Sequence, residues 1–210
     1  CNSQTELLKL YTEETLRRYY NKGDFRMWGN IEKIREYIEN VSEYPIDIAL
    51  HMAECYATIN ATTALNFIKH SSLETWINKQ IEKKQLSDEL LNAVSIIVYV
   101  YASLYNELRY PKILKYIKWT EENIELGKKS KDRIIYNIAS ALSLMEKNKE
   151  SNAWISKIQV DNSEYNQELY RLLLRNYNEL GETKNAINVA SKMKSFSCED
   201  ILGNFIARLK

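Results

Sequence analysis

The chain has 210 residues, of which 45% are apolar and 27% charged, a balance typical of a folded, core-forming protein. Its 29 basic and 28 acidic residues leave a formal net charge of +1, so nothing in the charge favours binding to nucleic acid or to an anionic membrane surface. No apolar run reaches the roughly 18–20 residues of a membrane-spanning helix, and only five glycines and two prolines are present. This scarcity predicts long helices with short connections.

The chain begins with Cys1, which the polar residues 2–4 follow. The other cysteines, Cys55 and Cys198, lie far away, and an odd number of widely spaced cysteines does not predict a disulfide framework. This start resembles the mature end of a bacterial lipoprotein, whose N-terminal cysteine carries lipid. The resemblance implies a tether at residues 1–4 and an extracytoplasmic protein, in the periplasm or at the cell surface, held to the membrane by lipid alone. The alternative is that Cys1 is an arbitrary starting point of the sequence and that the protein is cytoplasmic.

Apolar side chains recur at helical spacing in the first third of the chain and predict helices there. These helices cover residues 5–22, 28–41 and 45–59, and a return helix that includes residues 64–68. Gly23 and Asn60 stand at the turns between them. Residues 69–87 interrupt the spacing, although Trp76 and Ile81 indicate either a continuing helix or an additional one.

The middle of the chain carries clear helix boundaries. Asp88 begins a helix expected to run to about Leu108, because acidic residues are favoured near a helix N-terminus. Pro111 suits the first turn of the next helix, and Gly127 ends that helix. The run at 93–105 is the longest apolar stretch, and we interpret it as a buried helix. A further hairpin is predicted over residues 132–147 and 151–158, with Asn148 at its turn.

Residues 167–193 form the clearest hairpin in the sequence. One helical face carries Leu169, Leu172, Leu173, Tyr177 and Leu180. Gly181 then ends the helix, because glycine readily adopts a left-handed cap. Ala186 and Ala190 are four residues apart, so they share one face of the second helix and allow close approach of a neighbour. A last helix over residues 198–209 is predicted to cap the chain with a polar outer face.

This hairpin resembles a tetratricopeptide repeat, a helix–turn–helix unit of about 34 residues. The positions that match its pattern are Tyr170, Leu173, Tyr177, Gly181 and Ala186, and those that depart from it are Leu174, Ala190 and Met193. The resemblance implies an all-α fold, a right-handed α-α superhelix of about five hairpins with a C-terminal cap helix, in one domain over residues 5–210. The predicted turn residues are unevenly spaced, and other helical solenoids stay open as alternatives. These turn residues are Gly23, Asn60, Arg109, Asn148 and Gly181.

The resemblance also implies a concave groove, lined by the first helix of each hairpin, that binds a protein or peptide. The implied groove residues are Glu13, Arg17, Glu54, Tyr99, Ser103, Asn106, Arg171, Arg175 and Asn178. Arg171 and Arg175 are spaced i, i+4, so their two guanidinium groups share one face and can grip a carboxylate. Solvation of the two arginines, or pairing with Glu168 and Glu179, is the alternative.

Candidate catalytic groups are sparse. His51 and Cys55 are four residues apart, and such a pair can serve as base and nucleophile, but in an apolar stripe we interpret them as core residues. Three nearby acids are interpreted as a solvated helix face rather than as paired carboxylates: Glu121, Glu122 and Glu125. We expect no catalytic, metal or cofactor site, and a non-enzymatic scaffold for a protein or peptide partner. The alternatives are the sensory portion of a larger regulator and, less favoured, an enzyme of unknown type.

Overall fold

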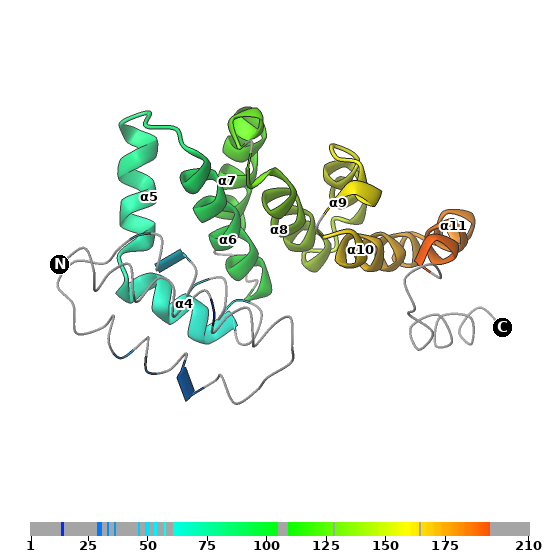
Figure 1. The fold of residues 1–210 in the computed structure, drawn as a ribbon, viewed down its shortest axis with the longest axis horizontal. Helices are drawn as coiled ribbons and strands as arrows, with labels where there is room; N and C mark the ends of the chain where they lie inside the picture. Colours follow the sequence, from blue (N-terminus) through cyan, green and yellow to red (C-terminus); the bar gives the residue numbers. More distant parts are fainter. Residues whose placement is uncertain are drawn as a thin grey trace. The chain divides into compact units, whose positions relative to one another are not determined.

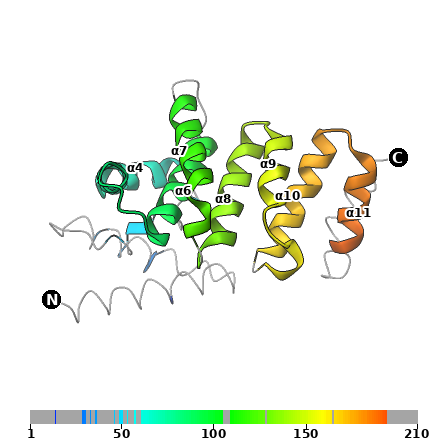
Figure 2. The ribbon, with the colours of Figure 1, turned by 90° about the horizontal axis from the view of Figure 1, so that it is seen from above.

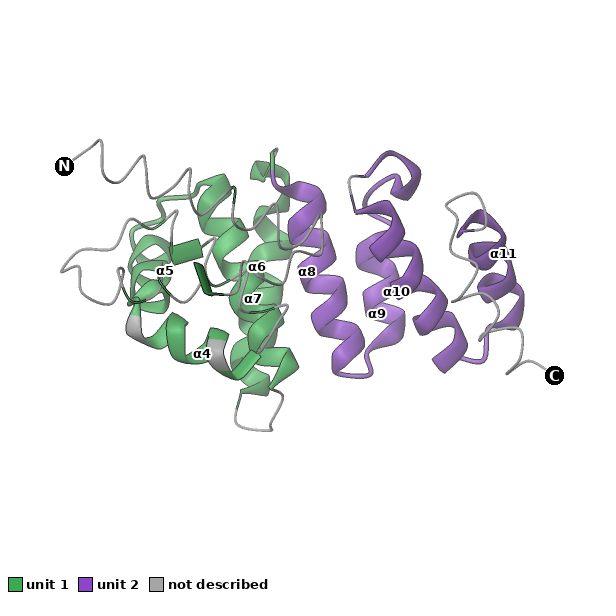
Figure 3. Ribbon diagram, turned by 60° about the horizontal axis from the view of Figure 1, so that its bottom comes forward, with its two compact units in different colours: residues 1–129 green, residues 130–210 purple. Residues whose placement is uncertain are grey.

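The computed structural model describes residues 61–104, 109–127, 129–163 and 165–193, together with isolated positions before residue 61. Within these residues the chain forms eight α-helices and two short 3-10 helices, with no strand, which confirms the predicted all-α class (Figure 1). The chain divides into two compact units, residues 1–129 and 130–210, coloured green and purple in Figure 3. The predicted tether, the helices over residues 5–59 and the cap helix over residues 198–209 lie outside the described residues, apart from the isolated positions.

The first unit is built around one central helix. Its described helices are α4 (Ala61–His70), α5 (Leu73–Glu82), α6 (Asp88–Ser103) and α7 (Tyr110–Asn123), which η2 (Ile124–Leu126) extends. Helix α6 packs against α4, α5 and α7, and its residues 90–98 are all buried. A helix covered on several sides needs no polar stripe. This explains the apolar run that begins at residue 93 and confirms its interpretation as a buried helix as far as Ser103, whereas residue 105 lies outside the described residues.

The boundaries of these helices follow local chemistry. The Ser87 hydroxyl oxygen accepts a hydrogen bond of 3.1 Å from the backbone N–H of Leu90, a side-chain cap that starts α6 where the sequence predicts. Pro111 lies in the first turn of α7, and Gly127 follows its 3-10 extension, also as predicted. The interruption at residues 69–87 contains a separate helix, α5, whose Leu73 and Ile77 are fully buried.

The second unit contains two consecutive helical hairpins, whose helices follow one another in chain order in Figure 2. The first hairpin is α8 (Lys131–Leu144) with α9 (Asn148–Ile155), and the second is α10 (Asn166–Glu179) with α11 (Thr183–Met193). The short helix η3 (Val160–Asn162) lies in the connection between the hairpins. Helix α10 packs against α11 and also against α8 and α9 of the preceding hairpin.

The first helices of both hairpins end in the same way. Glu146 and Gly181 have left-handed backbones, with φ of 61° and 68°. The N–H of the following residue reaches back in each case, from Lys147 to the Leu142 carbonyl at 2.9 Å and from Glu182 to the Tyr177 carbonyl at 2.8 Å. These caps lie 35 residues apart. The turn therefore lies at Glu146 rather than at Asn148, which is the first residue of α9.

A small side chain allows close packing in each hairpin. Ala186 lies five residues after its cap and is 1% exposed, and Ser151 occupies the same place after Glu146 and is fully buried. The Ser151 hydroxyl donates a hydrogen bond of 2.8 Å to the carbonyl of Ala139 in α8. The backbone of α8 and the side chain of α9 are thus in direct contact.

Candidate functional site

Helix α10 exposes one narrow stripe to solvent. Among residues 169–176, only Arg171 and Arg175 are exposed, because α8, α9 and α11 cover the other faces. Asn178 is exposed one turn further along. Residues spaced i, i+4, i+7 share a face of a helix. The structure therefore places these three predicted groove residues together on one exposed stripe.

The stripe carries both signs of charge, because Glu168 lies three residues before Arg171 and Glu179 lies four residues after Arg175. Arg175 forms no ion pair with Glu179, or with any other residue in the part of the chain that the structure describes. Arg171 does have an interaction partner within the structure, so the two arginines differ in this respect. An anionic group bound at the stripe would accept hydrogen bonds from both guanidinium groups.

A second polar group lies where α8 meets the start of α10. The Arg133 Nε donates a hydrogen bond of 2.9 Å to the Tyr165 hydroxyl, and the rings of Tyr136 and Tyr165 stack with centroids 5.3 Å apart and planes 15° apart. At the far end of the two helices, the Ser143 hydroxyl donates to the Asn176 side-chain oxygen at 2.7 Å. Contacts at both ends show that α8 and α10 run side by side.

The sequence does not predict the roles of Arg133, Tyr136 and Tyr165. The signal that could have found Tyr136 is its distance from the turn, because it lies ten residues before Glu146, as Arg171 lies ten residues before Gly181. Placing the turn at Asn148 shifts this register by two residues and puts a buried side chain, Ile138, at the equivalent position.

Two other predicted groove residues, Tyr99 and Ser103, lie on α6 in the first unit, and both are partly exposed. The Ser103 hydroxyl donates a hydrogen bond of 2.9 Å to the Tyr99 carbonyl, a bond within the helix itself. The remaining predicted residues, Glu13, Arg17, Glu54 and Asn106, lie outside the described residues, as does Cys1.

Within the first unit, Glu74 is the centre of a partly buried polar cluster. Its carboxylate accepts a hydrogen bond of 2.7 Å from the Tyr101 hydroxyl and forms an ion pair with Lys112. One turn along α5, the Asn78 side-chain oxygen accepts a hydrogen bond of 3.0 Å from the Tyr116 hydroxyl. Burial, and then the nearby Glu74, raises the pKa of both tyrosines. Both hydroxyls therefore stay protonated, and the cluster joins α5 to α6 and α7.

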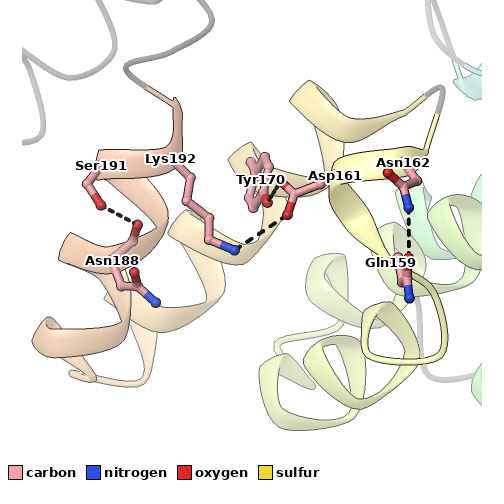
Figure 4. A network of polar contacts seen from close by, with 7 residues as sticks. All are labelled: Gln159, Asp161, Asn162, Tyr170, Asn188, Ser191 and Lys192. Carbon is pink, nitrogen blue, oxygen red and sulfur yellow. Dashed lines mark hydrogen bonds and ion pairs between the residues drawn. The ribbon is translucent and has the colours of Figure 1, made fainter.

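Figure 4 shows another polar group, in the second unit, where the carboxylate of Asp161 in η3 contacts both Tyr170 and Lys192. The Tyr170 hydroxyl donates a hydrogen bond to Asp161, and the Lys192 Nζ lies 3.7 Å from the other carboxylate oxygen. The same ammonium lies 5.7 Å from the centre of the Tyr170 ring. Burial, together with Asp161, raises the pKa of Tyr170 to about 12. This group holds η3 and α11 against α10.

The described residues also bear on the requirements of a metal site, a membrane-spanning helix and the predicted catalytic groups. Among them, no three His, Cys, Asp or Glu side chains gather in a way that could hold a metal ion. No helix in that part of the chain has the length and apolar character to cross a membrane. The His51 and Cys55 pair lies outside it. All three acids of the predicted solvated face are exposed: Glu121, Glu122 and Glu125.

Comparison of the chain with protein-family models, with curated proteins and with solved structures gives no match. The likeness to a helical repeat therefore rests on the residues of this chain and on the hairpins that they form.

Proposed function

We propose that the protein is a non-enzymatic scaffold that binds an acidic protein or peptide segment along α10. The observation that carries this proposal is the exposed stripe of Arg171, Arg175 and Asn178, in which each arginine stands between buried residues of the same helix. Both guanidinium groups can donate paired hydrogen bonds to a carboxylate, and the Asn178 amide offers a further donor.

We also infer that the two hairpins of the second unit are tetratricopeptide-like repeats. Three features support this inference: a spacing of 35 residues between the caps, close to the family's period of about 34, left-handed caps of the same form, and a small buried side chain five residues after each cap. In such repeats the first helix of each hairpin, here α8 and α10, carries the binding surface.

A selection experiment tests the binding proposal. The immobilised protein is exposed to a phage-displayed library of random 12-residue peptides, in parallel with the double variant Arg171→Gln, Arg175→Gln. We expect the unmodified protein to enrich peptides with several Asp and Glu residues and the double variant to lose that enrichment. A matched control removes two exposed lysines of the same unit, Lys149→Gln and Lys184→Gln, and so changes the net charge equally.

Two outcomes would contradict the proposal. One is a selection that enriches no acidic peptides on the unmodified protein. The other is an acidic enrichment that both double variants lose equally, because that result would reflect net charge rather than the arginine stripe.

The lipid tether at Cys1, and with it the extracytoplasmic location, stays a prediction. Mass spectrometry of the N-terminal peptide from native membranes tests it. A diacylglycerol-modified Cys1 is the expected result, and an unmodified cysteine, or one preceded by further residues, would reject the tether.

A further inference from the structure

Partly exposed aromatic side chains lie where α8 meets the start of α10, the helix that carries the arginine stripe. Helix α8 is buried throughout residues 137–143, and among residues 133–143 only Arg133 and Tyr136 are partly exposed. Tyr165, which immediately precedes α10, is also partly exposed and stacks on Tyr136. Both the stacked tyrosine rings and the arginines of α10 are therefore accessible to solvent.

The basic side chains around α8 and α10 include most of the arginines, whereas lysine is the usual basic residue elsewhere in residues 61–193. Residues 61–193 contain 15 lysines but only four arginines, and three of these arginines are Arg133, Arg171 and Arg175. The fourth, Arg109, donates a hydrogen bond of 2.7 Å to the Leu104 carbonyl in the first unit. Arginine binds carboxylates through a planar, two-pronged set of donors and also stacks on aromatic rings, which lysine does less well. The composition fits an acidic partner that also carries a planar group.

The register between the hairpins gives Tyr136 and Arg171 equivalent positions on neighbouring helices. Tyr136 and Arg171 lie ten residues before equivalent caps, on helices that run side by side. Axes of packed helices are roughly 8–10 Å apart. An extended peptide covers about 3.3–3.6 Å per residue. A peptide that crosses from α10 to α8 would thus move from the arginines to the rings within two or three residues.

We infer that Tyr136 and Tyr165 form a subsite for an aromatic side chain of the acidic segment that Arg171 and Arg175 bind. This inference rests on the proposed function and specifies the partner: a peptide with an aromatic residue two or three positions from its nearest carboxylate. Aromatic pairs contribute enough beyond their buried area to change a dissociation constant by roughly 2- to 12-fold.

Single-stranded nucleic acid also stacks on tyrosine and pairs with arginine. The partly exposed Glu168 and the exposed Glu179 lie at either end of the arginine stripe and repel negative charge. A nucleic-acid strand carries a phosphate at every nucleotide and cannot avoid these two carboxylates, whereas a peptide can confine its acidic residues to the arginines. The acidic peptide is therefore the occupant that the charges favour.

The test repeats the peptide selection on the unmodified protein and on Tyr136→Leu and Tyr136→Phe. We expect aromatic residues to be enriched two or three positions from the acids on the unmodified protein and on Tyr136→Phe. Tyr136→Leu should lose the aromatic enrichment and keep the acidic one. Tyr165→Leu serves as the second variant if Tyr136→Leu does not fold, and Tyr110→Leu, at a partly exposed tyrosine of the first unit, is the control.

The outcomes separate this inference from the proposed function. Acidic peptides without any aromatic preference would overturn the aromatic subsite alone, whereas no acidic enrichment at all would overturn both. Binding of a fluorescein-labelled 20-nucleotide oligothymidine that Tyr136→Leu weakens, without aromatic enrichment among peptides, would assign the rings to nucleic acid and reject the inference. A synthetic peptide from the enriched class should bind Tyr136→Leu roughly 2- to 12-fold more weakly and Tyr136→Phe unchanged.

Discussion

The hydroxyl of Ser143 in α8 donates a hydrogen bond of 2.7 Å to the side-chain oxygen of Asn176 in α10. The Asn176 amide nitrogen donates in turn to the Ser151 hydroxyl and to the Asn152 side-chain oxygen, both at 2.8 Å. Asn176 is fully buried, and every polar atom of its side chain has a partner. Because these partners come from α8 and α9, one side chain fixes how α10 lies on the preceding hairpin.

Asn176→Ala should lower the free energy of unfolding by about 2–4 kcal/mol, since it strips hydrogen bonds from several buried groups at once. Urea unfolding followed by circular dichroism measures the change. Asn178→Ala, at an exposed position of the same helix, should change stability by less than about 0.5 kcal/mol. Equal effects of the two substitutions would show that the buried network does not hold the hairpins together.

Substitutions at the two helix caps, Glu146 and Gly181, should change the stability of the protein in opposite directions. Glu146→Gly should stabilise the protein by up to about 1 kcal/mol, because it removes a side chain from a left-handed backbone, and Gly181→Ala should destabilise it by about 1 kcal/mol. A Cβ at Gly181 would meet no atom within 4 Å, so the loss there comes from the backbone alone. Thermal unfolding checks both. A destabilised Glu146→Gly variant would contradict this account.

Glu74→Gln should destabilise the first unit by about 1–2 kcal/mol, because it weakens a charge-assisted hydrogen bond from Tyr101 and removes the ion pair with Lys112. Most of the effect should come from the hydrogen bond, since the Lys112 side chain is 44% exposed and solvent screens its charge. Chemical unfolding measures it, with the exposed Glu82→Gln on the same helix as control. A loss as small as that of the control would mean that the cluster contributes little.

The buried tyrosines predict instability in alkali. Folding raises the pKa of Tyr170 from 10.0 to about 12, and it raises those of Tyr101 and Tyr116 as well. As the pH rises, the unfolded chain therefore loses these protons before the folded chain does. The stability that the three protonated tyrosines contribute is complete below pH 10 and declines as the pH rises toward and past 12. Unfolding midpoints measured from pH 8 upward should fall above pH 10, and less steeply in Tyr170→Phe. An equal slope in that variant would contradict the raised pKa of Tyr170.

Parts of the fold that depend on local chemistry could be predicted from the sequence. Asp88, Pro111, Gly127 and Gly181 mark helix boundaries where the structure has them, because caps and turns involve neighbouring residues. The turn at Glu146 could not be found, since a glutamate there adopts the left-handed backbone that normally indicates glycine.

The site was predicted only in part for a related reason. Arg171 and Arg175 stand in the hairpin whose turn does contain glycine, so their shared exposed stripe follows from the sequence. Tyr136 belongs to the hairpin with the unmarked turn, and its partner Tyr165 is 29 residues away in the chain. The cluster around Glu74 likewise joins residues 27 and 38 apart. Contacts of this kind depend on how helices pack, which periodicity does not specify.

The most direct test of the central claim is the dissociation constant of one synthetic acidic peptide from the selection, measured by fluorescence anisotropy. Loss of charge-assisted hydrogen bonds should weaken its binding to the Arg171→Gln, Arg175→Gln variant at least about tenfold. Binding to the Lys149→Gln, Lys184→Gln variant should stay close to that of the unmodified protein. Unchanged binding to the arginine variant, or equal weakening in the lysine variant, would contradict the proposal that α10 carries the binding surface.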